Sequence, residues 1–221
     1  MLFSIIRSGG DMVAVLTWLL STAFVVFCTL PVHEFAHAWT AIKLGDGTAR
    51  LSGRLTLNPM KHLDLIGSIL IFVTGFGWAK PVPVNQNNFN NPKKGMALTA
   101  LAGPLSNLIM AFVFMIFMHV FGIFHNTAAY ILALFFQYAA VVNIQLAVFN
   151  LLPVPPLDGS RIFWAILPDK YYWKVMQYER IIMIVLFVLL LVGVLSWPLN
   201  FLSGLVYDLF NFIVGLPFRL F

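Results

Sequence analysis

Long apolar runs separated by short polar segments make up most of the chain, and their lengths predict helices. The first run extends from about Met12 to Leu44, because no breaker interrupts it between Pro31 and Gly45. Pro31 itself is expected to kink this helix or to loosen its hydrogen bonds. Three further apolar helices are predicted at residues 96–124, 129–152 and 181–197, the first of them with a break at AGPLSN. Residues 201–216 form a final apolar segment that either spans the membrane or lies in its interface.

Three stretches depart from this pattern. Residues 45–61 are polar, and the alternation in ARLSGRLTL predicts a short strand or hairpin. Residues 63–78 are apolar but short for a full span, so a tilted or re-entrant element is expected there. The prolines of NLLPVPPLDGSR end a helix, and a short helix is predicted to restart at 159–167.

These elements predict an all-α polytopic membrane protein with roughly five to six transmembrane or re-entrant helices. A small membrane-associated β-strand element is expected between the first helix and the next. The composition agrees, since 61% of the residues are hydrophobic, 10% are charged and the mean hydropathy is +0.91. We expect residues 1–221 to form a single intramembrane domain that crosses a prokaryotic cell membrane several times.

The net charge of +5 comes from lysines and arginines that are concentrated in the polar segments. One cluster lies between residues 43 and 94 and another between 161 and 180, whereas the turn at 122–129 has none. Because cytosolic loops are enriched in these residues, both clusters are expected in the cytosol, and the N-terminus and that turn outside. No basic helix or recognisable motif supports nucleic-acid binding. The single cysteine, Cys28, excludes a disulfide framework and a cysteine-based zinc site.

The motif HEFAH at residues 33–37 is the main chemical signal. His33 and His37 are four residues apart, so in a helix their imidazoles lie one turn apart on one face and can bind one ion. Glu34 flanks that ion as a general base, which is the H-E-x-x-H arrangement of zinc metalloproteases. Ionisable groups at membrane depth are costly and therefore indicate function. The alternative, two histidines hydrogen-bonded in a helix–helix contact, leaves Glu34 unexplained.

A catalytic zinc ion usually has three protein ligands, so a third ligand is needed. Asp158 follows the interrupted helix in PPLDG, where a broken backbone at membrane depth must line a cavity or be buried. Asp158 is therefore the best candidate, although an aspartate there also suits the N-cap of the next short helix. Asp64, before the short apolar run, is the second candidate.

HEFAH in an apolar helix, followed far along the chain by NLLPVPPLDG, resembles the site-2 protease family of intramembrane zinc metalloproteases. The intervening GRLTLNPMKHLDLIGS, GWAKPVPVN and LAGPLSN are similar to the compact bacterial and archaeal members. We therefore expect neither the PDZ-like insertion nor the CBS-type tail of larger relatives. The resemblance extends from about residue 30 to residue 165. Asp64-Leu65 stands where relatives often have Asp-Pro.

This resemblance implies that one Zn²⁺ ion is bound by His33, His37 and Asp158. It also implies that Glu34 is the catalytic base and that Asn150 takes part in handling the substrate. The implied activity is regulated intramembrane proteolysis, in which a zinc endopeptidase cuts in or near transmembrane segments. The implied partners are the lipid bilayer and a transmembrane protein or peptide substrate. The active site is expected nearer the cytosolic side.

Several alternatives stay open at this level. Asn107 in AGPLSN either orients a ligand or a water molecule in the site, or makes a structural hydrogen bond between helices. ARLSGRLTL or KPVPVN is expected to offer a strand edge to an unwound substrate. A transporter also contains broken helices and buried ionisable groups, but it needs more carboxylates than this chain offers. A catalytically inactive binding scaffold is the other alternative.

Overall fold

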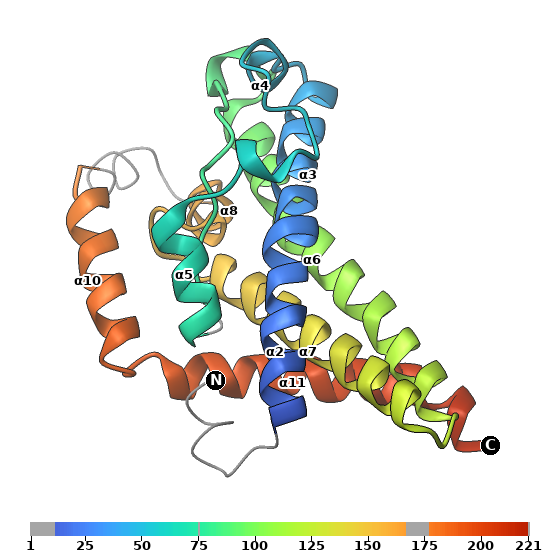
Figure 1. The fold of residues 1–221 in the computed structure, drawn as a ribbon. Helices are drawn as coiled ribbons and strands as arrows, with labels where there is room; N and C mark the ends of the chain where they lie inside the picture. The colour runs from blue at the N-terminus through green and yellow to red at the C-terminus, as the bar shows by residue number, and fades with distance from the viewer. Residues whose placement is uncertain (1–11, 75, 167–176, 221) are drawn as a thin grey trace.

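The computed structural model describes residues 12–74, 76–166 and 177–220, and throughout these ranges the regular structure is helical (Figure 1). Short η elements, one π-helical and three of the 3₁₀ type, connect or extend the α-helices. In chain order the elements are α2 (Met12–Phe24), η1 (Val25–Thr29), α3 (Leu30–Lys43), α4 (Thr48–Leu51), η2 (Pro59–Lys61), α5 (Leu65–Thr74), η3 (Gln86–Asn88), α6 (Pro92–Gly122), α7 (Thr127–Asn150), α8 (Asp158–Trp164), α10 (Glu179–Leu191), α11 (Ser196–Gly215) and η4 (Pro217–Leu220).

Among the described residues, three helical segments are long and apolar enough to cross a membrane. They are α6, α7 and the continuous Met12–Lys43 helix formed by α2, η1 and α3. The pair α10 and α11 adds a fourth if it is one span, although the two helices meet at 82°. The ten residues of α5 reach about 15 Å, half the thickness of a bilayer core. The prediction of an all-α, multi-span membrane protein is confirmed, whereas the count of five to six transmembrane or re-entrant helices is not.

Pro31 changes the first helix locally without ending it. A proline has no N–H, and its ring collides with the carbonyl of the residue four positions earlier. Just before Pro31 the helix widens into the π-turn η1, and the Leu30 N–H donates to the carbonyl of Val25. α3 then continues to Lys43, close to the predicted end of the helix, so HEFAH lies in unbroken α-helix.

The strand or hairpin predicted within residues 45–61 is wrong. The Asp46 carboxylate accepts hydrogen bonds from the backbone and hydroxyl of Thr48 and starts the helical turn α4, after which Gly53 reverses the chain at φ +66°. Asn58 then caps η2 with its side chain. These local hydrogen bonds outweigh the alternating pattern, and no described segment pairs with this stretch as a strand.

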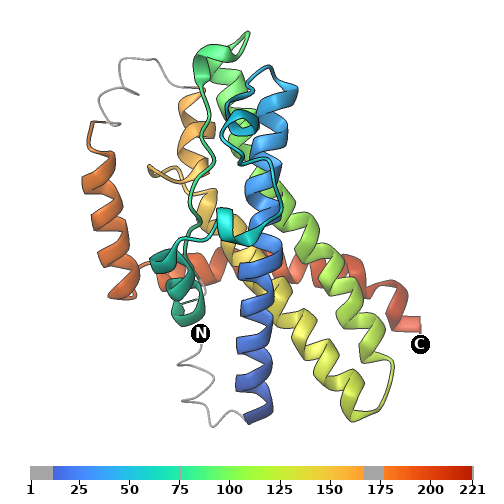
Figure 2. The same cartoon turned by 45° about the horizontal axis from the view of Figure 1, so that its top comes forward.

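α6 and α7 form an antiparallel hairpin that packs against the first helix and α11 (Figures 1 and 2). Asn91 caps the start of α6 and Asn126 caps the start of α7, each through its side-chain oxygen. The break predicted at AGPLSN is wrong, because α6 runs through the buried Pro104 without ending. Packed neighbouring helices stabilise a membrane helix that lacks one backbone hydrogen bond. The core surrounds the second half of α7, where almost every residue is buried.

Residues 76–85 form an irregular segment, here called the strap, that runs from the end of α5 alongside α3 towards η3 (Figure 2). The Lys80 N–H donates to the carbonyl of His62 over 2.7 Å. At the far end, the Asn85 N–H donates to the Asp46 carboxylate, also over 2.7 Å. The strap is therefore fixed at two points to the polar loop that follows α3.

Candidate metal centre

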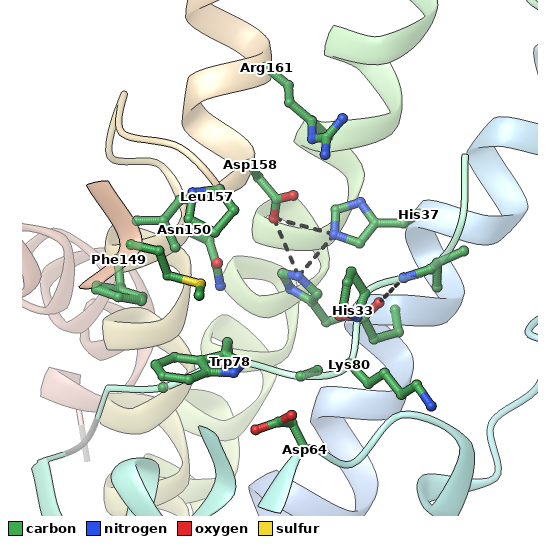
Figure 3. Close-up of a pocket in the computed structure, with 18 of the residues that line it drawn as sticks. His33, His37, Asp64, Trp78, Lys80, Phe149, Asn150, Leu157, Asp158 and Arg161 are labelled. Atoms are coloured by element: carbon green, nitrogen blue, oxygen red, sulfur yellow. Dashed lines mark hydrogen bonds and ion pairs between the residues drawn. The ribbon is translucent and has the colours of Figure 1, made fainter. Parts of the chain in front are cut away.

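His33, His37 and Asp158 bring their ligand atoms together at one point (Figure 3). Nε2 of His33 lies 2.9 Å from Nε2 of His37. Oδ2 of Asp158 lies 3.4 Å from the first nitrogen and 3.3 Å from the second. The histidines come from α3 and the aspartate from the start of α8, so the fold joins residues that are distant in sequence. Within the described ranges, no other three His, Cys, Asp or Glu side chains gather in this way.

This donor set fits a zinc ion. Ligand atoms about 2.1 Å from a tetrahedral ion lie about 3.4 Å from one another. The two histidine–aspartate separations, 3.3 and 3.4 Å, agree with this value, and the 2.9 Å between the histidines is shorter. Two imidazole nitrogens and one carboxylate oxygen match the three protein ligands of a catalytic zinc, whose fourth position is left for water or substrate.

The backbone of α6 holds both histidines in place. Nδ1–H of His37 donates to the carbonyl of Thr99 over 2.7 Å, which leaves the lone pair of Nε2 for an ion. Gly103 lies directly against the two rings, since a Cβ there would be 2.2 Å from Nε2 of His37 and 2.6 Å from Cε1 of His33. Both histidines are buried. α6 therefore sets the tautomer of one ring and limits the position of both.

Asp158 reaches the histidines because the chain turns sharply after α7. Gly159 packs on the end of α7, where a Cβ would lie 2.1 Å from the carbonyl oxygen of Leu151. The Ser160 hydroxyl donates to the carbonyl of Leu157 and closes the turn. Leu157 occupies the N-cap position of α8 and no side chain caps this helix, so the alternative reading of Asp158 as an N-cap is wrong.

Asp158 offers a carboxylate oxygen to the point where the two imidazole nitrogens meet, 3.4 Å from one and 3.3 Å from the other. The ionised carboxylate is the form that binds a metal ion.

Glu34 lies beside the three ligands without joining them. Its side chain is buried, and Oε2 accepts a hydrogen bond from the Val82 N–H of the strap over 3.1 Å. Oε1 makes no hydrogen bond to the described part of the chain. Glu34 therefore has one oxygen held by a neutral donor and one available for proton transfer, as a general base requires.

A cavity of about 430 Å³ opens between α3, the strap, the end of α7 and α10, and Glu34 lines it. Asn150 also lines the cavity, and one of its two amide N–H groups donates to the carbonyl of Leu146, so the other is available to a ligand. Asp64 lines the cavity too, but its carboxylate accepts from the Gly67 N–H at the start of α5. Asp64 does not join the ligand group, so the second candidate for the third ligand is not supported.

Four residues of the site have little or no signal in the sequence. Thr99 and Val82 act through backbone atoms, so their side chains do not indicate a role. Gly103 acts by lacking a side chain, and the glycine–proline pair in AGPLSN suggests only a turn. Arg161 lines the cavity, and its position one helical turn after Asp158 is the one available indication.

Known proteins with similar sequences point to the same chemistry. Residues 117–193 match Peptidase family M50. Over 176 residues the chain is 47% identical to the "Putative zinc metalloprotease YwhC" of Bacillus subtilis. This aligned region covers 76% of this chain and 80% of that protein. Over 217 residues it is 27% identical to the "Putative zinc metalloprotease Rip2" of Mycobacterium tuberculosis, which covers 96% of this chain and 78% of that protein. No solved structure matches the chain.

Proposed function

Because the chain belongs to peptidase family M50, the site-2 protease family, we propose that His33, His37 and Asp158 hold its catalytic zinc ion and that this centre cuts transmembrane segments. The chain is an intramembrane zinc metalloprotease. One observation carries the site assignment: two α3 side chains and one from a distant turn converge on one point, beside a buried glutamate.

The residues around that point have distinct tasks. His33, His37 and Asp158 would hold a zinc ion, which would supply a Lewis acid for the scissile carbonyl and a water with a pKa of about 7. Glu34 accepts a proton from the attacking water and delivers it to the leaving amine. The Val82 N–H keeps the carboxylate of Glu34 oriented while this happens. Asn150 donates its remaining N–H to the oxyanion that develops on the substrate.

The substrate is a transmembrane protein or peptide whose helix unwinds locally, because the amides of an intact helix are already hydrogen-bonded. ARLSGRLTL forms α4 and a turn, so KPVPVN in the strap is the remaining candidate strand edge. Within it, Val84 lines the cavity and its N–H makes no hydrogen bond to the described residues. We expect Val84→Pro, which removes this donor, to reduce cleavage while zinc stays bound. Unchanged cleavage would exclude the strap as a pairing edge.

We also propose that the protein is a multi-pass protein of a prokaryotic cell membrane with its active site nearer the cytosol. The polar loop after α3 and the start of α6, which carry lysines and arginines, lie at the same end of the molecule as the C-terminus of α3 (Figure 1), and such loops are usually cytosolic. His33 is about 15 Å along the helix from Lys43. A membrane-impermeant thiol reagent applied from outside should label His125→Cys and spare Asn87→Cys. The opposite labelling would reverse the orientation.

The proposed function is tested by metal analysis and by cleavage of single-span membrane peptides. Wild-type protein should bind zinc and cleave, Glu34→Gln should retain zinc and lose cleavage, and Asp158→Ala should bind zinc more weakly. Full zinc occupancy and activity in Asp158→Ala would contradict the ligand assignment. Solute transport without cleavage would favour the transporter, and zinc binding without cleavage in the wild type would favour the inactive scaffold.

A further inference from the structure

One face of α6 carries buried, mostly small residues at every fourth position: Gly95, Thr99, Gly103, Asn107, Ala111 and Met115. Small residues let neighbouring membrane helices approach closely. Asn107 differs from the others because it carries a polar side-chain amide and is completely buried, with 0% of its surface exposed. Neither its Oδ1 nor its Nδ2 has a hydrogen-bond partner in the described part of the chain. A buried amide without a partner is destabilising, so its presence here needs a reason.

A second buried group lacks a partner close by. It is Nδ1 of His33, on the edge of the ring away from the nitrogen that meets the other ligands. Histidines that bind a metal through one ring nitrogen almost always donate the other N–H to an acceptor. His37 follows this rule through the carbonyl of Thr99. His33 has no corresponding acceptor among the described residues.

The register between α3 and α6 places Asn107 on the face of α6 that meets the two histidines. The two helices run antiparallel (Figure 1), and Thr99 meets His37 while Gly103, one turn later, meets both rings. Asn107 follows one further turn along α6, about 6 Å along its axis. In an imidazole, Nδ1 and Nε2 flank Cε1 on opposite sides. Since Nε2 of His33 points to His37, Nδ1 points the other way, which is the direction from Gly103 to Asn107.

We propose that Asn107 is a positioning residue of the metal centre, whose amide oxygen accepts the Nδ1–H of His33 directly or through one water molecule. This inference rests on the proposed function, since it takes His33 as a metal ligand. The hydrogen bond keeps the proton on Nδ1, so that the lone pair of Nε2 faces the ion, and it stops the ring from rotating. α6 then holds His37 through the backbone of Thr99 and His33 through the side chain of Asn107.

Zinc affinity of the full chain, measured in detergent by competition with a chelator, tests this assignment. Asn107→Leu keeps the side-chain size and removes the acceptor, and it should weaken zinc binding roughly 10- to 100-fold. Its kcat should fall while KM for a membrane peptide stays unchanged, because Asn107 does not touch the substrate. Asn107→Asp keeps an acceptor oxygen and should bind zinc about as well as the wild type.

Ser21→Ala is the matched control, because its buried hydroxyl is a donor to two carbonyls far from the site, that of Thr17 at 2.7 Å within α2 and that of Phe135 at 3.0 Å on α7. It should lower the thermal stability of the metal-free protein and leave zinc affinity unchanged. If Asn107→Leu keeps the zinc affinity of the wild type and loses as much thermal stability as Ser21→Ala, the proposal is overturned and Asn107 has a structural role only. Asn107→Ala, which introduces no new bulk, decides the question by the same criterion if the leucine variant does not fold. A wild-type protein that binds no zinc would instead overturn the proposed function.

Discussion

Replacing Gly103 with alanine should disable the centre by displacing its histidines. The new Cβ would lie 2.2 Å from Nε2 of His37 and 2.6 Å from Cε1 of His33. Ordinary van der Waals contact begins at 3.4 Å, so the nearer ring must move by about 1.2 Å, or α3 and α6 must separate. His37 is tied to the Thr99 carbonyl at 2.7 Å and has little freedom to move. Metal ligands tolerate shifts of about 0.2 Å, so we expect at least a tenfold loss of zinc affinity. Since a misplacement of about 1 Å can cost roughly 100-fold in rate, cleavage should fall by that order.

Gly204→Ala is the control for this substitution. Gly204 also lies inside a helix, and a Cβ there meets nothing within 4 Å. Alanine in a helix interior is more favourable than glycine by about 0.8–1.0 kcal/mol, so this variant should be as active as the wild type and equally or more stable. Zinc affinity by chelator competition and cleavage rate should be measured for both variants. If Gly103→Ala keeps wild-type zinc affinity and activity, the close approach of α6 does not position the ligands.

Three further substitutions test separate parts of the site and its support. Glu34→Gln should lower kcat by about 10²–10⁴-fold while zinc binding, measured by metal analysis, stays intact. Gly159→Ala should weaken zinc binding in a chelator titration, because its Cβ would lie 2.1 Å from the Leu151 carbonyl oxygen and must push the third ligand away. Asp46→Ala should lose about 1–3 kcal/mol of unfolding free energy, since this carboxylate accepts the Asn85 N–H and fixes the strap. Burial raises the pKa of Asp46, but hydrogen bonds from its neighbours hold that pKa below its ordinary value. Its stabilisation is therefore complete above about pH 4, and the difference between wild type and variant in thermal unfolding should shrink as the pH falls further.

Each of these outcomes has a clear opposite. Cleavage by Glu34→Gln at the wild-type rate would assign the base to another group. Wild-type zinc affinity in Gly159→Ala would show that the turn after α7 relaxes without moving Asp158. A constant stability difference between Asp46→Ala and wild type from pH 7 to pH 3 would mean that the Asp46 carboxylate does not act through its charge.

Most of the helices could be predicted from the sequence because apolar length is a local property of the chain. The first helix, α6, α7 and the short α8 all appear close to their predicted positions. The strand prediction in ARLSGRLTL failed because the side chains of Asp46 and Asn58 accept hydrogen bonds from the backbone and favour turns on either side of it. The break at Pro104 failed because a proline's effect depends on the helices packed around it.

The chemistry of HEFAH was equally local, since the four-residue spacing alone brings His33 and His37 to one helix face. Asp158 was inferred from a broken helix at membrane depth, and the structure brings it to the histidines. Whether that third group reaches the site depends on the turn after α7, which a pattern of residue types does not specify.

The sequence by itself therefore determined the membrane class, the main helices and the pairing of His33 with His37 on one helix face, because these depend on hydrophobic length and on spacing within one helix. Only the tertiary structure decided what holds these side chains and Glu34 in place: the Thr99 carbonyl, the Val82 N–H and the close approach of both histidine rings to Gly103. Every residue has the same backbone atoms and every glycine lacks a side chain, so the residue type alone does not indicate these roles. Their function arises from the packing of α6 and the strap against α3, which is a property of the folded chain.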